Sequence, residues 1–382
     1  MNSFSLYIHW PFCIKKCPYC DFNSYAWKND PEEWTTLLIK EIEFYSETFK
    51  NYKINTIFFG GGTPSLIPSF LIEKILNKIK EFWNIKGIEI TIEINPSSIE
   101  TGNLENFLKV GINRFSIGVQ SLSDMDLNFL GRIHSAEEAK KIVTEASKIC
   151  NNVSTDYIYT LPYDDLPKWK KDLDKILDFS LHNNIKHLSL YQLTIEENTQ
   201  FAHDVRVKKW IPMNQDKQSI LYRYTHKIFH KLHWNQYEIS NISQSIEYES
   251  QHNLCYWNYN QYLGIGPGAH SRMIINNQKY KFNNYKNPNK WKEQINNTVE
   301  KNQFVEEYET LSLKDQTIEK MLMGFRLKKG IFLYENELNY VNKTNLQLLI
   351  DKNFIKNNNN VYTLSLNGRL KLNAILRMLI ED

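Results

Sequence analysis

Hydrophobic positions in the first 200 residues follow two alternating patterns, short runs typical of strands and longer stretches with the repeat of amphipathic helices. The strand-like runs lie at residues 5–10, 54–60, 88–95, 114–120, 154–162 and 187–195. Helical periodicity fills the intervals, most clearly after Asp30 and after His134. Six successive strand–helix units predict an α/β fold with a parallel sheet and right-handed crossovers. An open doubly wound sheet and a curved partial barrel both fit this order.

The alternation within two of these strands favours the barrel. In residues 88–95 isoleucine holds every second position and polar side chains hold the others, and residues 114–120 alternate in a similar way. A parallel strand that is covered on both faces is nearly all apolar. A polar face therefore indicates a ligand-filled interior, with its site at the carboxyl ends of the strands. Edge strands with one solvated face would give the same alternation.

The pattern changes after residue 200. A helix is predicted near residues 214–233, and the Tyr- and Asn-rich stretch 237–272 predicts irregular structure. From about residue 310, helices, a hairpin around the Asn run at 357–360 and a closing amphipathic helix predict a small winged-helix-like α+β unit. The sequence thus predicts three parts, which are residues 1–240, 241–305 and 306–382.

Charge and hydropathy exclude several classes of protein. The 46 Lys and Arg residues against 43 Asp and Glu leave a net charge of +3, far from the basic footprint of a nucleic-acid binder. No apolar run approaches the roughly 18 residues that a membrane span needs. The amino terminus has no basic residue before Lys15, and its apolar run is interrupted by His9 and Pro11, so it does not resemble a secretory signal. We therefore expect a cytoplasmic protein with no membrane span and no nucleic-acid partner.

Glycine and cysteine are scarce and clustered. Six of the 14 glycines lie at 60–62 and at 264, 266 and 268, and three of the five cysteines are Cys13, Cys17 and Cys20. The second glycine group only superficially resembles a dinucleotide fingerprint, because it lacks the strand–turn–helix frame and the downstream acid. Both groups predict loops that pass close to a neighbour. An odd cysteine count without a signal peptide indicates metal binding rather than disulfides.

Three thiolates on one loop can bind three irons of a cubane cluster and leave the fourth iron open to a small molecule. A structural zinc ion would need a fourth ligand, for which His9, Cys150 and Cys255 are candidates. A chance grouping of the three thiols is the third possibility.

The cysteine spacing CxxxCxxC, with the aromatic Tyr19 before the last Cys, resembles the signature of radical S-adenosylmethionine proteins. The resemblance implies a partial (β/α)6 barrel, a [4Fe–4S] cluster on the three cysteines and S-adenosylmethionine at its open iron. Residues 60–64, GGGTP, follow the second strand, where that family accepts the methionine amino group. A tight turn before a helix, with Thr63 or Ser65 as its cap, would explain part of this segment.

Longer blocks resemble the HemN/HemW subfamily more narrowly. These blocks, in order, are YIHWPFCIKKCPYCDF, IFFGGGTPSL, GINRFSIGVQS, LGRIH, YQLTIEENT, HNLCYW and YLGIGPGAHS, and the closing module is similar to that subfamily's carboxyl-terminal domain. The resemblance implies that the cluster-bound S-adenosylmethionine is held by Tyr7, Gly61 and Glu93. It implies cofactor contacts, in some relatives to a second molecule, from Tyr19, Gly62, Thr63, Gln120, Arg132 and Asp156. Taken alone, Arg132 would be interpreted as a surface arginine.

The subfamily contains two kinds of protein. Its oxygen-independent coproporphyrinogen dehydrogenases are characterised by the motif CxxxCxxCxC and by an amino-terminal extension. In the similar segment of this chain the last position is Phe22, and the first strand is predicted to start near residue 5. Its haem chaperones are characterised by the motif CxxxCxxCxF, a short amino terminus and the motif HNxxYW, and this chain resembles them in all three features. The resemblance therefore implies a haem chaperone with haem, a haem-acceptor protein and a cluster reductant as partners. A radical enzyme, either a coproporphyrinogen dehydrogenase or another, and a structural iron–sulfur or zinc module are the alternatives.

The HNxxYW motif here runs from His252 to Trp257. A neutral imidazole can ligate haem iron, so His252 is the candidate ligand, and Tyr256 and Trp257 could pack on the porphyrin. A histidine beside two aromatic residues also fits a packed core position. Cys255 could compete as an axial ligand or be a buried inert thiol.

Overall fold

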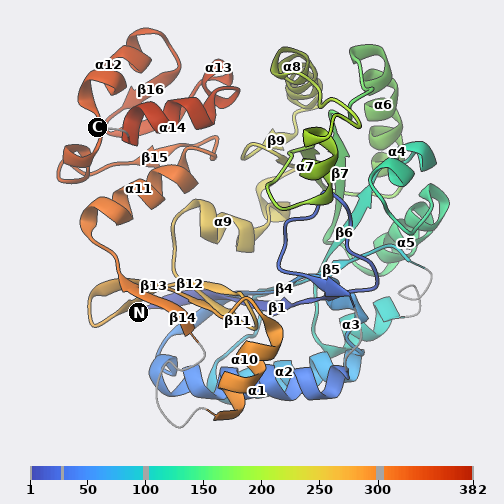
Figure 1. Ribbon diagram of the computed structural model, residues 1–382, viewed down its shortest axis with the longest axis vertical. Helices are drawn as coiled ribbons and strands as arrows, with labels where there is room; N and C mark the ends of the chain where they lie inside the picture. Colours follow the sequence, from blue (N-terminus) through green and yellow to red (C-terminus); the bar gives the residue numbers. More distant parts are fainter. Residues whose placement is uncertain (1, 27–29, 98–102, 298–304, 381–382) are drawn as a thin grey trace.

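One large curved sheet dominates the computed structural model, which describes residues 2–26, 30–97, 103–297 and 305–380 (Figure 1). Its twelve strands are hydrogen-bonded in the order β14-β13-β12-β11-β1-β4-β5-β6-β7-β8-β10-β9. Their bounds, in chain order, are β1 Ser3–Trp10, β4 Lys53–Gly61, β5 Glu89–Ile94, β6 Arg114–Gln120, β7 Val153–Tyr159, β8 His187–Gln192, β9 Asn235–Gln236, β10 Asn241–Ser243, β11 Tyr262–Ile265, β12 His270–Ile275, β13 Gln278–Asn284 and β14 Val305–Thr310.

The six strands predicted from the sequence are β1 and β4 to β8, and each pairs in parallel with its neighbour. Strand β11 adds a further parallel strand beside β1, and antiparallel strands extend the sheet at both ends. In Figure 1 the strands turn from nearly horizontal at β1 and β4 to upright at β6 and β7. The predicted partial barrel is confirmed.

Helices cover the outer face of this sheet, with α1 and α2 under β1 and β4 (Figure 1). The predicted helices after Asp30 and His134 and near residue 214 are confirmed, and a Ser135–Glu138 capping box fixes the start of the second. The helices are α1 Pro31–Phe49, α2 Ser69–Phe82, α3 Leu104–Val110, α4 Asp124–Phe129, α5 Ala136–Ile149, α6 Leu166–His182, α7 Gln200–Arg206, α8 Gln215–Lys231 and α10 Pro288–Asn297.

The main core lies between the sheet and these helices. In β5 the isoleucines Ile90, Ile92 and Ile94 are at most 4% exposed and pack in this core. The alternate positions of the same strand point inward, so the period-2 pattern separates core from barrel interior.

The prediction of irregular structure over residues 237–272 is wrong. This stretch contains β10, the 3-10 helix η3 (Ile246–Tyr248), helix α9 (Gln251–Trp257) and β11. Helix α9 is too short for an amphipathic repeat, and contacts distant in sequence fix it. Ser250 caps it through the backbone N–H of Asn253, and the Glu89 carboxylate of β5 accepts the N–H groups of Gln251 and His252 at 3.1 and 3.0 Å.

The carboxyl-terminal unit has its own core, formed by residues such as Met321, Phe325, Tyr362 and Leu376. It contains α11 Leu313–Gly324, β15 Ile331–Phe332, η4 Glu337–Tyr340, α12 Lys343–Asp351, β16 Ile355–Asn358, β17 Val361–Leu364, α13 Leu366–Arg369 and α14 Leu372–Ile380. The predicted hairpin is β16–β17. The three-part division of the chain stays a prediction, and β11 to β14 share the sheet of the barrel strands. Among the described helices, none has the length and apolar character needed to cross a membrane.

Candidate functional site

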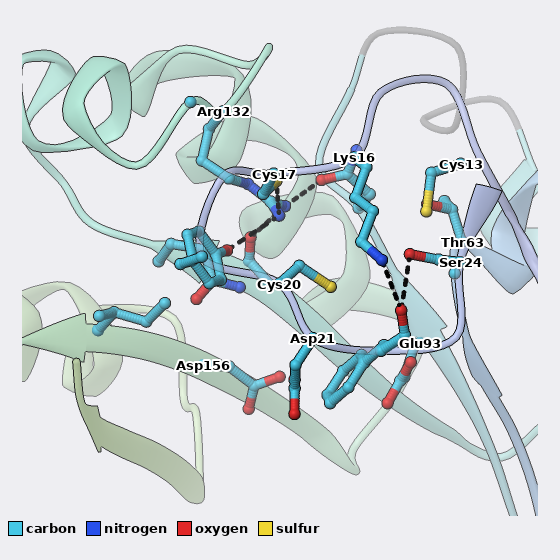
Figure 2. A pocket seen from close by; sticks show the side chains of 18 of the residues that line it. Cys13, Lys16, Cys17, Cys20, Asp21, Ser24, Thr63, Glu93, Arg132 and Asp156 are labelled. Carbon is cyan, nitrogen blue, oxygen red and sulfur yellow. Dashed lines mark hydrogen bonds between the residues drawn. The ribbon is translucent and has the colours of Figure 1, made fainter. Parts of the chain in front are cut away.

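A cavity of about 430 Å³ opens at the carboxyl ends of β4 to β8 (Figure 2). The residues predicted for the cluster and for S-adenosylmethionine converge there from six segments far apart in the sequence. Those that line it are Cys13, Cys17, Tyr19, Cys20, Gly61, Gly62, Thr63, Glu93, Gln120, Arg132 and Asp156. Tyr7 lines an adjoining cavity instead, together with Gly61 and Glu93.

The cysteine loop spans the mouth of this cavity. Cys13 ends the short strand β2 (Phe12–Cys13), which pairs with β3 (Tyr25–Ala26) and so closes the loop at its base. Within the loop the Cys20 N–H donates to the Cys17 carbonyl at 3.1 Å, and the Lys16 ammonium donates to the Phe22 carbonyl at 2.9 Å. Figure 2 shows all three sulfur atoms on this one loop.

The donor set fits a cubane cluster better than a zinc ion. The zinc candidate His9 donates from Nε2 to the Asn23 carbonyl at 2.8 Å and accepts from the Tyr7 hydroxyl at 3.1 Å, so both nitrogens are engaged. In the described ranges no three His, Cys, Asp or Glu side chains form a group that could hold a single metal ion. A cubane places each thiolate on a different iron, which suits three thiols spread along one loop.

The thiols of Cys150 and Cys255 belong to other surroundings. Both side chains are buried, and they donate to backbone carbonyls, Cys150 to Asn113 at 3.6 Å and Cys255 to Gln261 at 3.3 Å. Burial raises the pKa of both thiols, and that of Cys255 to about 11. Buried protonated thiols of this kind act as small apolar side chains.

The glycine segment lets the end of β4 lie directly against the cysteine loop. The Gly62 N–H donates to the Trp10 carbonyl at 2.6 Å, and a Cβ on Gly62 would lie 2.5 Å from the Phe12 carbonyl oxygen. Gly61 has a φ of +111°, and its Cβ would lie 2.5 Å from the His9 ring. A side chain at either position would thus displace the loop that carries the thiols.

Thr63 contributes to the thiol site rather than to a helix cap. It precedes the 3-10 helix η1 (Pro64–Leu66), and its side chain makes no capping bond to that helix in the described structure. Figure 2 shows its hydroxyl and that of Ser24 beside the Cys13 thiol, where they favour the ionised form. Burial outweighs this effect and raises the pKa of Cys13, so binding iron as a thiolate would release a proton.

Two half-buried carboxyl groups, Glu93 and Asp156, give the cavity a preference for cations. Glu93 accepts from the Gly61 N–H at 3.2 Å, and burial followed by repulsion from Asp156 raises its pKa to about 8. Asp156 accepts from the hydroxyls of Ser116 at 3.0 Å and Ser154 at 3.3 Å, and burial raises its pKa as well. The ammonium and sulfonium charges of S-adenosylmethionine would relieve this repulsion, so the residues fit that ligand.

Arg132 is not a surface arginine. Its guanidinium donates to Cys17 Sγ at 3.5 Å, to the Tyr19 hydroxyl at 3.4 Å and to the Gly118 carbonyl at 3.2 Å, and it also bonds Asn95 (Figure 2). It thereby ties the cysteine loop to the end of β6. Its permanent charge lies next to the thiol that the sequence assigns to the cluster.

Of the candidate haem residues in the HNxxYW motif, His252 and Tyr256 contact each other, whereas Trp257 contacts the carboxyl-terminal unit. His252 is 1% exposed, and its ring nitrogens lie 2.8 Å from Thr56 Oγ1 and 2.8 Å from the Tyr256 hydroxyl. Burial lowers its pKa to about 3, so it is neutral, and its ring stacks on Phe58. Trp257 packs under the Arg326 guanidinium of the carboxyl-terminal unit. In this geometry His252 has the contacts of a core histidine, and a haem role for the motif stays a prediction.

Sequence reasoning missed the residues that hold the loops together. Asn23 accepts from His9 and donates from Nδ2 to the carbonyls of Pro267 and Lys286, both at 2.9 Å, which joins the cysteine loop to the second glycine group. Glu41 of α1 accepts from the Gly266 N–H at 2.8 Å although it is fully buried. The one available signal for Asn23 was its place three residues after Cys20. A lone Glu within a helical pattern gave no signal at all.

These features define a radical S-adenosylmethionine protein, because a three-cysteine loop and a cavity lined by two carboxyl groups occupy the carboxyl end of a partial (β/α)6 barrel. Comparison with known families agrees, since residues 7–176 match the model described as "Radical SAM superfamily".

Comparison with individual proteins narrows the class. Heme chaperone HemW of Buchnera aphidicola subsp. Acyrthosiphon pisum is 36% identical over 99% of this chain and 98% of its own. Heme chaperone HemW of Haemophilus influenzae is 32% identical over the same shares. "Radical S-adenosyl methionine domain-containing protein 1, mitochondrial" of Danio rerio is 34% identical over 91% of this chain and 78% of its own. The chain belongs to the HemW family of radical S-adenosylmethionine proteins.

A solved structure supports the fold over the whole length. The coproporphyrinogen III oxidase HemN of Escherichia coli superposes with a TM-score of 0.82 over 100% of this chain and 90% of its own. The sequence identity is 19%, so this likeness shows the fold alone. It confirms the predicted architecture of a radical S-adenosylmethionine barrel with a carboxyl-terminal domain.

Replacing Glu93 with Gln should weaken S-adenosylmethionine binding to the cluster-loaded protein at least tenfold. A hydrogen bond to a charged group contributes roughly 1.5–3 kcal/mol, and a factor of ten corresponds to about 1.4 kcal/mol. Equilibrium dialysis with labelled ligand measures the change. Glu105→Gln, on the exposed face of α3, is the matched control and should leave the affinity unchanged. Equal affinities in the wild type and Glu93→Gln would contradict the role given to Glu93.

Proposed function

We propose that this protein is a haem chaperone that carries a [4Fe–4S] cluster and S-adenosylmethionine and passes haem to an acceptor protein. The observation that carries the proposal is the similarity, over nearly the full length of both chains, to proteins named heme chaperone HemW. An acceptor protein and a reductant for the cluster are parts of the same proposal.

Within this proposal the described residues have separate tasks. Cys13, Cys17 and Cys20 would hold the cluster, which supplies one-electron chemistry and an open iron for chelation. Gly61 and Glu93 would bind the amino group of S-adenosylmethionine through a backbone carbonyl and a carboxylate. The other predicted residues of the cavity would orient the ligand, and they are Tyr19, Gly62, Thr63, Gln120, Arg132 and Asp156.

The assignment is tested by haem binding and haem transfer in one anaerobic preparation. The reconstituted protein should shift the Soret band of added haemin in a saturable titration. The haem-loaded protein should then transfer its haem to an apo-haem protein. This transfer should be faster than the uptake of free haemin by the same apo-haem protein. A chain that holds a full cluster but does not bind haemin would contradict the proposal.

Incubation with coproporphyrinogen, S-adenosylmethionine and a reductant should give no protoporphyrinogen. The reason is Phe22, which is 56% exposed and lines the cavity. In the motif of the dehydrogenases, CxxxCxxCxC, the corresponding position is a further Cys. Chromatography with fluorescence detection of the oxidised porphyrins is the measurement, and Escherichia coli HemN under the same conditions is the positive control. Clear turnover would favour the alternative, a coproporphyrinogen dehydrogenase.

A further inference from the structure

A second cavity of about 580 Å³ adjoins the cluster cavity and shares part of its wall. Gly61, Glu93 and Phe22 line both cavities. The new walls are rich in aromatic side chains, and they come from β1, the cysteine loop, α9 and β11. These aromatic residues are Tyr7, Tyr25, Tyr256 and Tyr262, and Phe22 lies on the wall that the two cavities share. The volume lies in the range of about 300–1,000 Å³ that cofactor-sized ligands use, and the walls suit a flat apolar ring system.

One histidine of this cavity is available to a ligand. His270, the first residue of β12, is exposed, and its ring makes no hydrogen bond to any residue in the described part of the chain. His9, which lines the same cavity, has both ring nitrogens engaged, as does the buried His252. Reduced contact with water, followed by the nearby charges of Arg272 and Lys286, lowers the pKa of His270. Its imidazole is therefore neutral at physiological pH, the form that ligates metals.

The rim of this cavity carries positive charge. Lys16 and Lys286 are both exposed on it, one from the cysteine loop and the other after β13. Two ammonium groups can pair with two carboxylates on a ligand that lies between them. Asp21 and Glu93 also line the cavity and add two carboxyl groups to its walls.

The loop that carries His270 is held in place by a network that includes Asn23 of the cysteine loop. The preceding Gly268 has a φ of +74° and lies so close to Asn23 that a Cβ would be 2.5 Å from its Nδ2. Asn23 in turn bonds the carbonyls of Pro267 and Lys286. The Glu41 carboxylate holds the same loop, because it accepts hydrogen bonds from the Gly266 N–H and from the side-chain amide of Asn284. The second glycine group is thus a close-approach loop, as predicted, and it presents His270 to the cavity.

We infer that this second cavity is the haem-binding site and that His270, rather than His252, is the axial ligand of the haem iron. The inference rests on the proposed haem-chaperone function and adds the position of the cargo to it. The porphyrin lies against the aromatic walls, and its two propionates point to Lys16 and Lys286. Haem so placed adjoins the cluster cavity across the wall formed by Gly61 and Glu93.

The test is an anaerobic absorption titration of the cluster-loaded full chain with haemin and, separately, with iron-free protoporphyrin. His270→Ala should weaken haemin binding at least tenfold and move the Soret band toward that of free haemin. Its affinity for protoporphyrin should stay within twofold of wild type, because that ligand forms no axial bond. In His270→Gly, added imidazole should restore the wild-type Soret band, which a purely structural role of His270 would not allow.

Two further variants separate the possible outcomes. His203→Ala, on the exposed side of α7, is the matched control and should bind haemin like the wild type. If His270→Ala keeps the wild-type affinity and spectrum, or if His252→Ala alone loses the Soret shift, the inference is overturned while the proposed function stands. If the wild type binds neither porphyrin, the proposed function fails and the inference fails with it.

Discussion

Replacing any one of Cys13, Cys17 and Cys20 with Ala should lower the iron content of the anaerobically reconstituted protein from about four atoms per chain to nearly none. In the proposed cluster each thiolate would bind its own iron, so the loss of one would leave two irons without a protein ligand. No described side chain can substitute, because His9 is engaged through both ring nitrogens and Asp21 is an oxygen ligand at an iron that prefers sulfur. Iron and sulfide assays together with electron paramagnetic resonance of the reduced protein measure the effect.

The remaining cysteines provide the matched controls. Cys150→Ala and Cys255→Ala should retain full iron content, because both thiols are buried and hydrogen-bonded to backbone carbonyls away from the loop. Iron retained in all three loop variants would contradict the cluster assignment. Zinc in the purified protein would contradict it as well and would restore the structural-zinc alternative.

Strand periodicity predicted the part of the site that lies on the barrel strands. Glu93 and Gln120 occupy polar positions of the two strands with an alternating pattern, and the structure places both on the cavity. In a parallel sheet this alternation has few explanations other than a polar interior, so local pattern and tertiary position agree.

Side chains that reach the site from loops could not be predicted in this way. Arg132 lies beyond the end of β6 in a stretch with no period, and its four hydrogen-bond partners come from three other segments. Its place in the site could be proposed only from a resemblance to a family. A haem role for His252 was likewise suggested by the resemblance, whereas its sequence context taken alone favoured the core position that it occupies.

Helix α9 shows why short elements escape a sequence-based prediction. Seven residues make fewer than two full helical turns, and the helix depends on the carboxylate of Glu89, more than 150 positions away, to bind its first N–H groups. Such a helix forms because the barrel is already present. Its residues are therefore read correctly only after the fold is known.

The close packing of the first glycine segment leads to a strong prediction for Gly61→Ala. Alanine in the left-handed region costs about 1–2 kcal/mol, and overpacking a tight contact adds about 1–3 kcal/mol. Here the new Cβ would meet the His9 ring and the Trp10 carbonyl, so His9 would move and its bond to Asn23 would break. We expect a markedly lower thermal midpoint and, because Asn23 anchors the cysteine loop, a substantial loss of iron.

Gly87→Ala is the matched control for this prediction. Gly87 also has a positive φ, +76°, but a Cβ there would find no described atom within 4 Å. Its replacement should therefore incur only the backbone term of about 1–2 kcal/mol and leave iron content intact. Thermal unfolding and iron assays on the two variants, prepared side by side under anaerobic conditions, separate the contributions of backbone conformation and packing. Equal midpoints and equal iron contents would show that the contact between the glycine segment and the cysteine loop does not hold the cluster site together.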